Sequence, residues 1–183
     1  MGSGLVLSEG VMTETDSFLA EVLDKVQIEK EISMPEVDEF IAGVIPRVTE
    51  MDEALHNGDA GPRKALWSHN DPVTLFGAVL TNVGWREIES TFDALASRFS
   101  NGTYEVEVIA AGASGDLGYL VAIEHTTVSV AGAPPEPYKL RVTTIFRREG
   151  GEWKIVHRHA DPVPGNTGAV SQTRKLADDL ENS

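Results

Sequence analysis

The segment 153–161, Trp-Lys-Ile-Val-His-Arg-His-Ala-Asp, carries the residue types best suited to acid/base chemistry. Side chains alternate between the two faces of a regular strand, so His157 and His159 are expected to share a face with the apolar Trp153. That face should point inward, because a tryptophan is too large and apolar for solvent. Imidazole titrates close to neutral pH and suits general acid/base work. We therefore predict His159 as general acid or base and His157 as the group that orients it. The alternative is that both histidines are structural and that their ring nitrogens are hydrogen-bonded within the protein.

A carboxylate inside an apolar strand is the third catalytic candidate. Glu124 and His125 follow the apolar run 119–123, and alternation turns one of the two inward. An inward Glu124 would have a raised pKa and could act as a base or orient His159. The alternative is an ion pair with Arg141 on the next strand, because buried charges are normally paired. Arg141 is also the candidate for binding a carboxylate or phosphate group of a ligand.

Four aromatic residues are candidate walls of a ligand pocket. They either fill the core or line a cavity for a hydrophobic molecule. These residues are Trp67, Phe76, Trp85 and Tyr119.

No metal and no cofactor are expected. A metal held by His157 and His159 would need a third ligand such as His125, Glu124 or Asp161, and the expected helices supply no obvious carboxylate. The chain has no phosphate-binding loop, no dinucleotide fingerprint and no serine nucleophile elbow. The absence of cysteine removes thiolate chemistry. Any chemistry is therefore expected to be acid/base chemistry in a pocket.

Helices are expected in the first half of the chain. Apolar residues at helical spacing predict an amphipathic helix over 15–31, a second helix that starts at the capping box 33–36 and continues past Pro46 to residue 55, a short helix at 63–67, and a further helix over 85–99.

Strands are expected after Gly102, where the apolar period changes to two. They are expected at 104–111, 117–130, 138–148 and 153–160, with a shorter strand at 73–76 before the last helix. The predicted fold class is α+β, a cone-shaped, strongly curved antiparallel sheet packed on three helices, with an extra N-terminal helix. The predicted organisation is an extension with a helix (1–33), one domain (34–162) and a tail (163–183).

Charge and hydropathy argue against two classes of partner, nucleic acid and membranes. The 183 residues include 15 basic and 29 acidic ones, a net charge of −14 that repels nucleic acid and anionic membranes. No apolar run is long enough to cross a bilayer, and the first residues lack the pattern of a secretory signal. We therefore expect a cytoplasmic protein with neither nucleic acid nor membrane as partner.

The order of these segments resembles the nuclear transport factor 2-like superfamily, in its SnoaL-like, ketosteroid-isomerase-like branch. The resemblance covers about residues 34–162 and rests on 71–77 (DPVTLFG), 84–88 (GWREI), 140–143 (LRVT), 147–149 (RRE) and 151–161 (GEWKIVHRHAD). The His-x-His ending is also similar to the association domain of calcium/calmodulin-dependent kinase II. The resemblance implies a cone-shaped pocket and a homodimer formed through the sheet, and we expect the ligand to be a small hydrophobic organic molecule. We place that interface on the face of Leu120, Ala122, Thr126 and Val128.

The resemblance does not fix an activity, because this fold hosts several enzyme classes and pure binding modules. In ketosteroid isomerase the catalytic base is an aspartate. The corresponding position in this sequence falls at or beside Leu75, where there is no carboxylate, so that mechanism is not expected. Two functions stay open: an acid/base enzyme of isomerase, cyclase, dehydratase or hydrolase type, and a non-catalytic ligand-binding or dimerisation module.

Overall fold

The structure is a computed structural model that describes residues 14–77 and 80–165. The chain divides into two compact units, one ending at Pro35 and the other beginning at Glu36, and each is described by itself. In the first unit the described residues are helical and belong to α1 (Glu14–Leu55), where Phe18 is 65% exposed. The helix expected over 15–31 lies within α1. The predicted tail falls mostly outside the described residues.

The second unit begins with the later turns of α1. Its buried residues recur every three or four positions and so form one apolar face: Phe40, Val44, Val48, Met51 and Leu55. The helix start expected at residue 33 is not observed, because α1 is continuous from Glu14 to Leu55. The helix also continues past Pro46, as predicted. This proline is exposed, so water can satisfy the carbonyl group that loses its N–H donor.

Two short helices follow. The first, α2 (Gly61–Leu66), begins with Pro62, whose fixed φ suits the first turn of a helix. The second, α3 (Trp85–Ala96), buries Ile88 and Phe92 completely.

One curved, unclosed six-stranded sheet completes the α+β fold, and this fold class confirms the prediction. Its order is β2-β1-β6-β5-β4-β3. All neighbouring strands are antiparallel except β1 and β6, which run parallel. The sequence did not predict that parallel pair or the short β2. The strands are β1 (Thr74–Phe76), β2 (Thr81–Val83), β3 (Phe99–Ser114), β4 (Leu117–Val130), β5 (Glu136–Glu149) and β6 (Glu152–Pro162).

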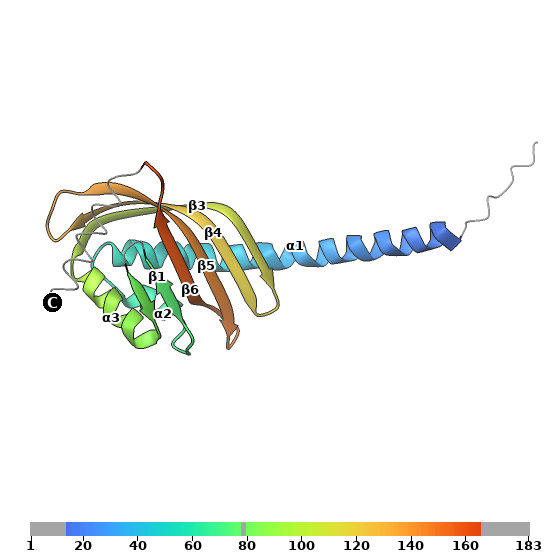
Figure 1. Cartoon of the computed structure of the whole chain (residues 1–183), viewed down its shortest axis with the longest axis horizontal. Helices are drawn as coiled ribbons and strands as arrows, with labels where there is room; N and C mark the ends of the chain where they lie inside the picture. Colours follow the sequence, from blue (N-terminus) through green and yellow to red (C-terminus); the bar gives the residue numbers. More distant parts are fainter. Residues whose placement is uncertain (1–13, 78–79, 166–183) are drawn as a thin grey trace, which may run out of the picture. The chain divides into compact units, whose positions relative to one another are not determined.

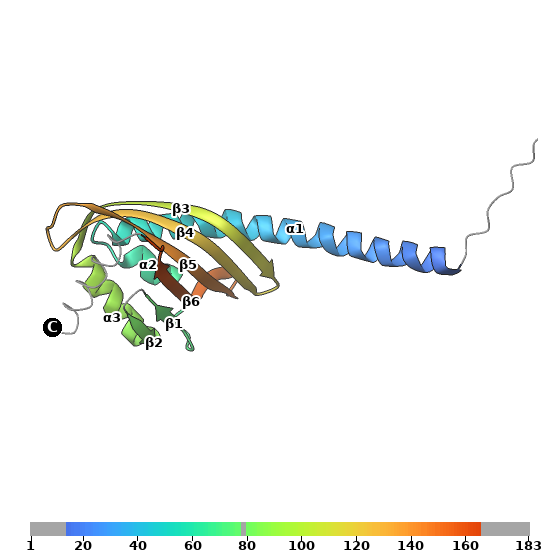
Figure 2. The same ribbon diagram turned by 45° about the horizontal axis from the view of Figure 1, so that its top comes forward.

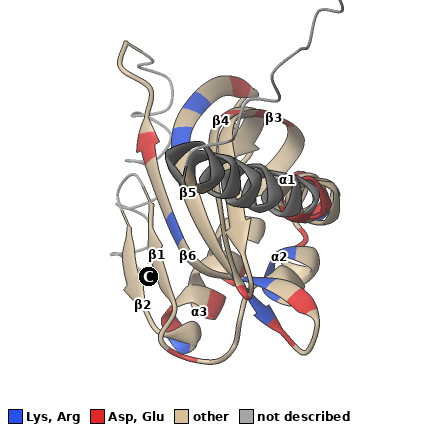
Figure 3. Ribbon diagram, turned by 90° about the vertical axis from the view of Figure 1, so that its right-hand side faces the viewer, with Lys and Arg blue, Asp and Glu red and all other residues tan. Residues whose placement is uncertain are grey.

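The long strands of this sheet curve over α2, α3 and the later turns of α1 (Figures 1 and 2). Alternate residues of β4 point toward the helices and are buried, among them Leu120, Ala122, Thr126 and Val128. The expectation that these four form a dimer interface is therefore wrong, because they belong to the core. In Figure 3, acidic and basic residues are interspersed along the strands and helices.

A β-bulge in β6 decides which side chains face inward. Ile145 of β5 pairs with His157, and the next residue, Phe146, pairs with Ile155, so Val156 is the extra residue. Ile155 is inward before the bulge, and Arg158 is inward after it. A regular strand would have turned both histidines inward instead.

Candidate functional site

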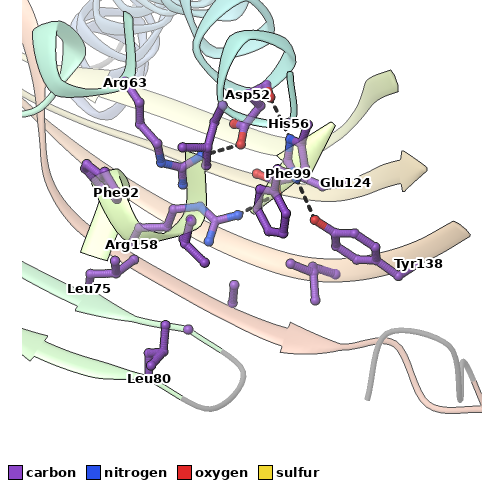
Figure 4. Close-up of a pocket in the computed structure, with 15 residues that line it drawn as sticks. Asp52, His56, Arg63, Leu75, Leu80, Phe92, Phe99, Glu124, Tyr138 and Arg158 are labelled. Carbon is purple, nitrogen blue, oxygen red and sulfur yellow. Dashed lines mark hydrogen bonds and ion pairs between the residues drawn. The ribbon is translucent and has the colours of Figure 1, made fainter. Parts of the chain in front are cut away.

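A pocket lies between the inner face of the sheet, the end of α1, α3 and the β1–β2 hairpin. Its cavity volume is about 100 Å³, and it is partly open to solvent. Half-buried Gly77, Leu80 and Leu95 mark its mouth. Six polar or charged side chains converge at its base, as Figure 4 shows: Asp52, His56, Arg63, Glu124, Tyr138 and Arg158. An apolar mouth over a polar base is typical of small-molecule sites.

The first ion pair at the base joins helices α1 and α2. Arg63 donates from Nη1 to Oδ1 of Asp52, and both side chains are at most 5% exposed. The guanidinium also lies over the ring of Phe92, 5.0 Å from its centroid. Oδ2 of Asp52 has no hydrogen-bond partner within the described part of the chain. This buried oxygen is thus free to accept a hydrogen bond or a proton from a ligand.

The second ion pair joins β4 and β6. Nη2 of Arg158 lies 2.5 Å from Oε2 of Glu124, and both side chains are at most 7% exposed. Burial raises the pKa of Glu124, and the charge of Arg158 opposes that rise. Arg158 keeps its proton under all ordinary conditions. A neutral Glu124 would leave that charge buried without a counter-ion, so the pair is ionised at neutral pH.

His56 connects the end of α1 to β5. Its Nδ1 lies 2.6 Å from the backbone oxygen of Asp52, and its Nε2 lies 2.7 Å from the hydroxyl oxygen of Tyr138. A carbonyl only accepts, so Nδ1 carries the proton and the Tyr138 hydroxyl donates to Nε2. Burial lowers the pKa of His56. The ring is therefore neutral, and both of its nitrogens are occupied.

The comparisons with known proteins place this geometry in a family. Residues 44–164 match the model of a SnoaL-like domain. The chain belongs to the SnoaL-like family. No curated protein matches it.

Solved structures similar to this SnoaL-like chain share its fold. A protein of the nuclear transport factor 2-like family from Streptomyces avermitilis is 21% identical over 69% of this chain and 97% of its own, with a TM-score of 0.60. A nuclear transport factor 2-like superfamily protein from Salmonella enterica is 18% identical over 72% and 94%, with a TM-score of 0.59. One with a cystatin-like fold from Novosphingobium aromaticivorans is 18% identical over 89% and 98%, with a TM-score of 0.53.

The histidines predicted from the sequence do not line the SnoaL-like pocket. His159 is exposed on the outer face of the sheet, with Nε2 3.6 Å from Oδ2 of Asp161. His157 is half-buried on the same face, and its Nδ1 lies 2.7 Å from the hydroxyl of Thr74. The expected inward orientation of both histidines is wrong because the bulge at Val156 shifts the alternation.

Glu124 is the one predicted site residue that lines the pocket. Of the two residues that alternation could turn inward, Glu124 and His125, it is Glu124 that faces inward, and its partner is Arg158 rather than Arg141. Arg141 is exposed on the outer face, where its Nη2 lies 3.9 Å from Oδ2 of Asp161. Glu124 and Arg141 lie on opposite faces of the sheet, because Arg141 pairs with Ile123, the residue before Glu124.

The four predicted aromatic walls lie elsewhere in the SnoaL-like fold. Trp67 is buried in the core, edge-on to Phe92. Phe76 meets the rings of His157 and His159 edge-on on the outer face. The remaining two also lie away from the pocket: Trp85 stacks on His69, and Tyr119 is 46% exposed.

Five polar residues of the pocket were not predicted from the sequence. Asp52 and His56 are one helical turn apart, beside the apolar face of α1, and this spacing was the available signal. Tyr138 is in phase with the apolar alternation of β5. Arg63 and Arg158 gave no comparable signal, because their burial depends on partners distant in the sequence.

The described residues include no group of three or more His, Asp or Glu side chains arranged to hold a metal ion. None of their helices is long and apolar enough to cross a membrane.

Proposed function

We propose that this SnoaL-like chain binds a small, largely apolar organic molecule in the pocket at the end of α1. The observation that carries the proposal is the free Oδ2 of Asp52: this residue lines the pocket, and its buried carboxylate oxygen has no partner among the described residues. Leaving such an atom unpaired is costly, so a ligand or water that donates a hydrogen bond to it is stabilised there.

An acid/base reaction is the second part of the proposal, and Asp52 is the residue that would perform it. Arg63 holds one carboxylate oxygen, which leaves the other as a proton acceptor of fixed orientation. His56 is not available for proton exchange, because both ring nitrogens already have partners. A ligand-binding module without catalysis uses the same pocket and differs only in leaving Asp52 as a hydrogen-bond acceptor.

The test is a substitution on the sheet that fills the pocket with a larger side chain. Ala160 and Ala122 are both inward-facing alanines of the sheet and at most 3% exposed, but only Ala160 lines the pocket. We expect Ala160→Leu to abolish the binding that saturation-transfer NMR detects from a mixture of cyclic alcohols, acids and amines, while Ala122→Leu preserves it. The proposal fails when no compound binds the wild type, or when both variants bind equally well.

A homodimer formed through the outer face of the sheet is a further part of the proposal. One row of paired residues crosses five strands on this face: Tyr119, Ile145, His157, Thr74 and Val83. Its three large hydrophobic residues are between 37% and 61% exposed. Exposed large hydrophobic residues gathered on one face are typical of interfaces, and Arg141 and Asp161 on the same face offer both signs of charge to a second copy of the chain.

A further inference from the structure

The charges of the residues at the base of the pocket cancel, and the polar atoms left unpaired on these residues include two donors and an acceptor. From these two features we propose that the pocket selects an uncharged ligand whose buried end carries a hydroxyl group, an alcohol or a phenol. This inference rests on the proposed function and names the ligand class of the same site.

The first step concerns charge. Asp52 with Arg63 and Glu124 with Arg158 form two ion pairs, each of zero net charge and almost fully buried. His56 adds none, since burial lowers its pKa. A ligand carboxylate or ammonium would therefore enter a buried site that has no spare counter-ion, and burying an unpaired charge is expensive. An uncharged ligand avoids that cost.

The second step concerns hydrogen bonds. Oδ2 of Asp52 can only accept, so it requires a donor from the ligand. Nε of Arg63 and Nε of Arg158 are buried donors that also have no partner among the described residues. A hydroxyl group both donates and accepts, whereas an ether or a ketone only accepts. The base of the pocket is thus complementary to a hydroxyl group.

The third step concerns size and the apolar part of the ligand. The cavity of about 100 Å³ is smaller than the roughly 150 Å³ cavity that encloses a benzene molecule. The hydroxyl-bearing end therefore enters, and the rest extends through the mouth. Apolar side chains line this path on several sides, as Figure 4 shows for three of them: Leu75, Leu80 and Phe92.

The test compares four probes that share one ring: cyclohexanol, methoxycyclohexane, cyclohexanecarboxylate and cyclohexylammonium. We expect cyclohexanol to bind the full chain at least about tenfold more tightly than either charged probe, and more tightly than the ether, in chemical-shift titrations at neutral pH. Equal or tighter binding of a charged probe or the ether overturns the inference. Binding of no probe at all, or binding that survives Ala160→Leu, contradicts the proposed function instead.

Charge variants provide a second test. Asp52→Asn leaves the charge of Arg63 without a counter-ion. The affinity for cyclohexanecarboxylate should therefore rise at least about tenfold relative to the affinity for cyclohexanol. The double variant Asp52→Asn with Arg63→Gln is neutral again, and the preference for an uncharged probe should return. An unchanged preference in the single variant overturns the inference. If Asp52→Asn does not fold, Glu124→Gln with and without Arg158→Gln makes the same comparison on the second pair.

Discussion

His56 is a buried histidine whose two nitrogens are bonded in one tautomer, and this has a consequence for stability. Burial lowers its pKa in the folded chain, while the unfolded chain titrates near the ordinary value of about 6.5. The unfolded state therefore binds the proton more readily. The stability associated with neutral His56 is present above that value and is lost as the pH falls through it toward the lower folded-state pKa.

We expect His56→Gln to reduce the pH dependence of stability in this window. Glutamine can keep hydrogen bonds to the same neighbours but does not titrate. Urea unfolding of wild type and variant, measured between about pH 7.5 and about pH 5, checks the difference in slope. Equal slopes for the two proteins would contradict the assignment of a lowered pKa to His56.

Two buried tyrosines provide a matched comparison of hydrogen bonding. The Tyr138 hydroxyl donates to His56, whereas the Tyr104 hydroxyl is buried without a partner in the described structure. Tyr138→Phe should cost about 1–3 kcal/mol, because it leaves Nε2 of His56 unsatisfied. Tyr104→Phe removes only an unpaired group and should be neutral or stabilising. Denaturant unfolding measures both, and equal losses would argue against the bond between Tyr138 and His56.

At the scale of elements, the end of α1 is fixed against the start of β3 by close packing at Gly102. A Cβ atom added there would lie 2.2 Å from Cβ of His56 and 2.5 Å from its backbone oxygen. The turn that follows α1 and the start of β3 also exchange hydrogen bonds: Asn57 donates to the Gly102 oxygen at 3.0 Å and accepts from its N–H at 3.1 Å. The helix end that carries Asp52, and His56 directly after it, are thereby held in position over the sheet.

We expect Gly102→Ala to destabilise the fold by about 1–3 kcal/mol or more, because backbone atoms must shift. Gly43→Ala is the control. Gly43 is an exposed helical residue with no atom within 4 Å of the added Cβ, so alanine there should stabilise by about 0.5–1 kcal/mol. Thermal unfolding of both variants measures the effects. A Gly102→Ala variant as stable as wild type would show that the two elements are not held this closely.

Much of the element pattern could be predicted from the sequence, because it depends on local periodicity. The limits of β4 (Leu117–Val130) match the prediction, and those of β5 and β6 differ by two residues or fewer at each end. The site was harder to predict, because the alternation of β6 was assumed to be regular. One extra residue, Val156, placed Arg158 where His157 or His159 was expected. For β4 the sequence predicted that either Glu124 or His125 faces inward, and Glu124 does; the regular pairing of β4 with β5 preserves the alternation on which that prediction depends.

At the scale of the whole molecule, the prediction concerns assembly through the outer face of the sheet. Light scattering at micromolar concentration should give the mass of a dimer. Ile145→Glu, between Tyr119 and His157 in the row, should give a monomer, because an unpaired charge would be buried in the interface. Ala42→Glu, on an exposed part of α1, should remain dimeric. A wild-type monomer, or a dimer that tolerates Ile145→Glu, contradicts this assembly.

The bulge at Val156 also has a consequence for how such pockets diversify. Gain or loss of one residue within a strand inverts the orientation of every side chain that follows, up to the next irregularity. Here that inversion exchanges two imidazoles for a guanidinium at the base of the pocket, without a single substitution in the residues concerned. Ancestral and descendant proteins could therefore differ in ligand chemistry through an insertion alone. Relatives compared by alignment columns would show the same residues on opposite sides of the sheet.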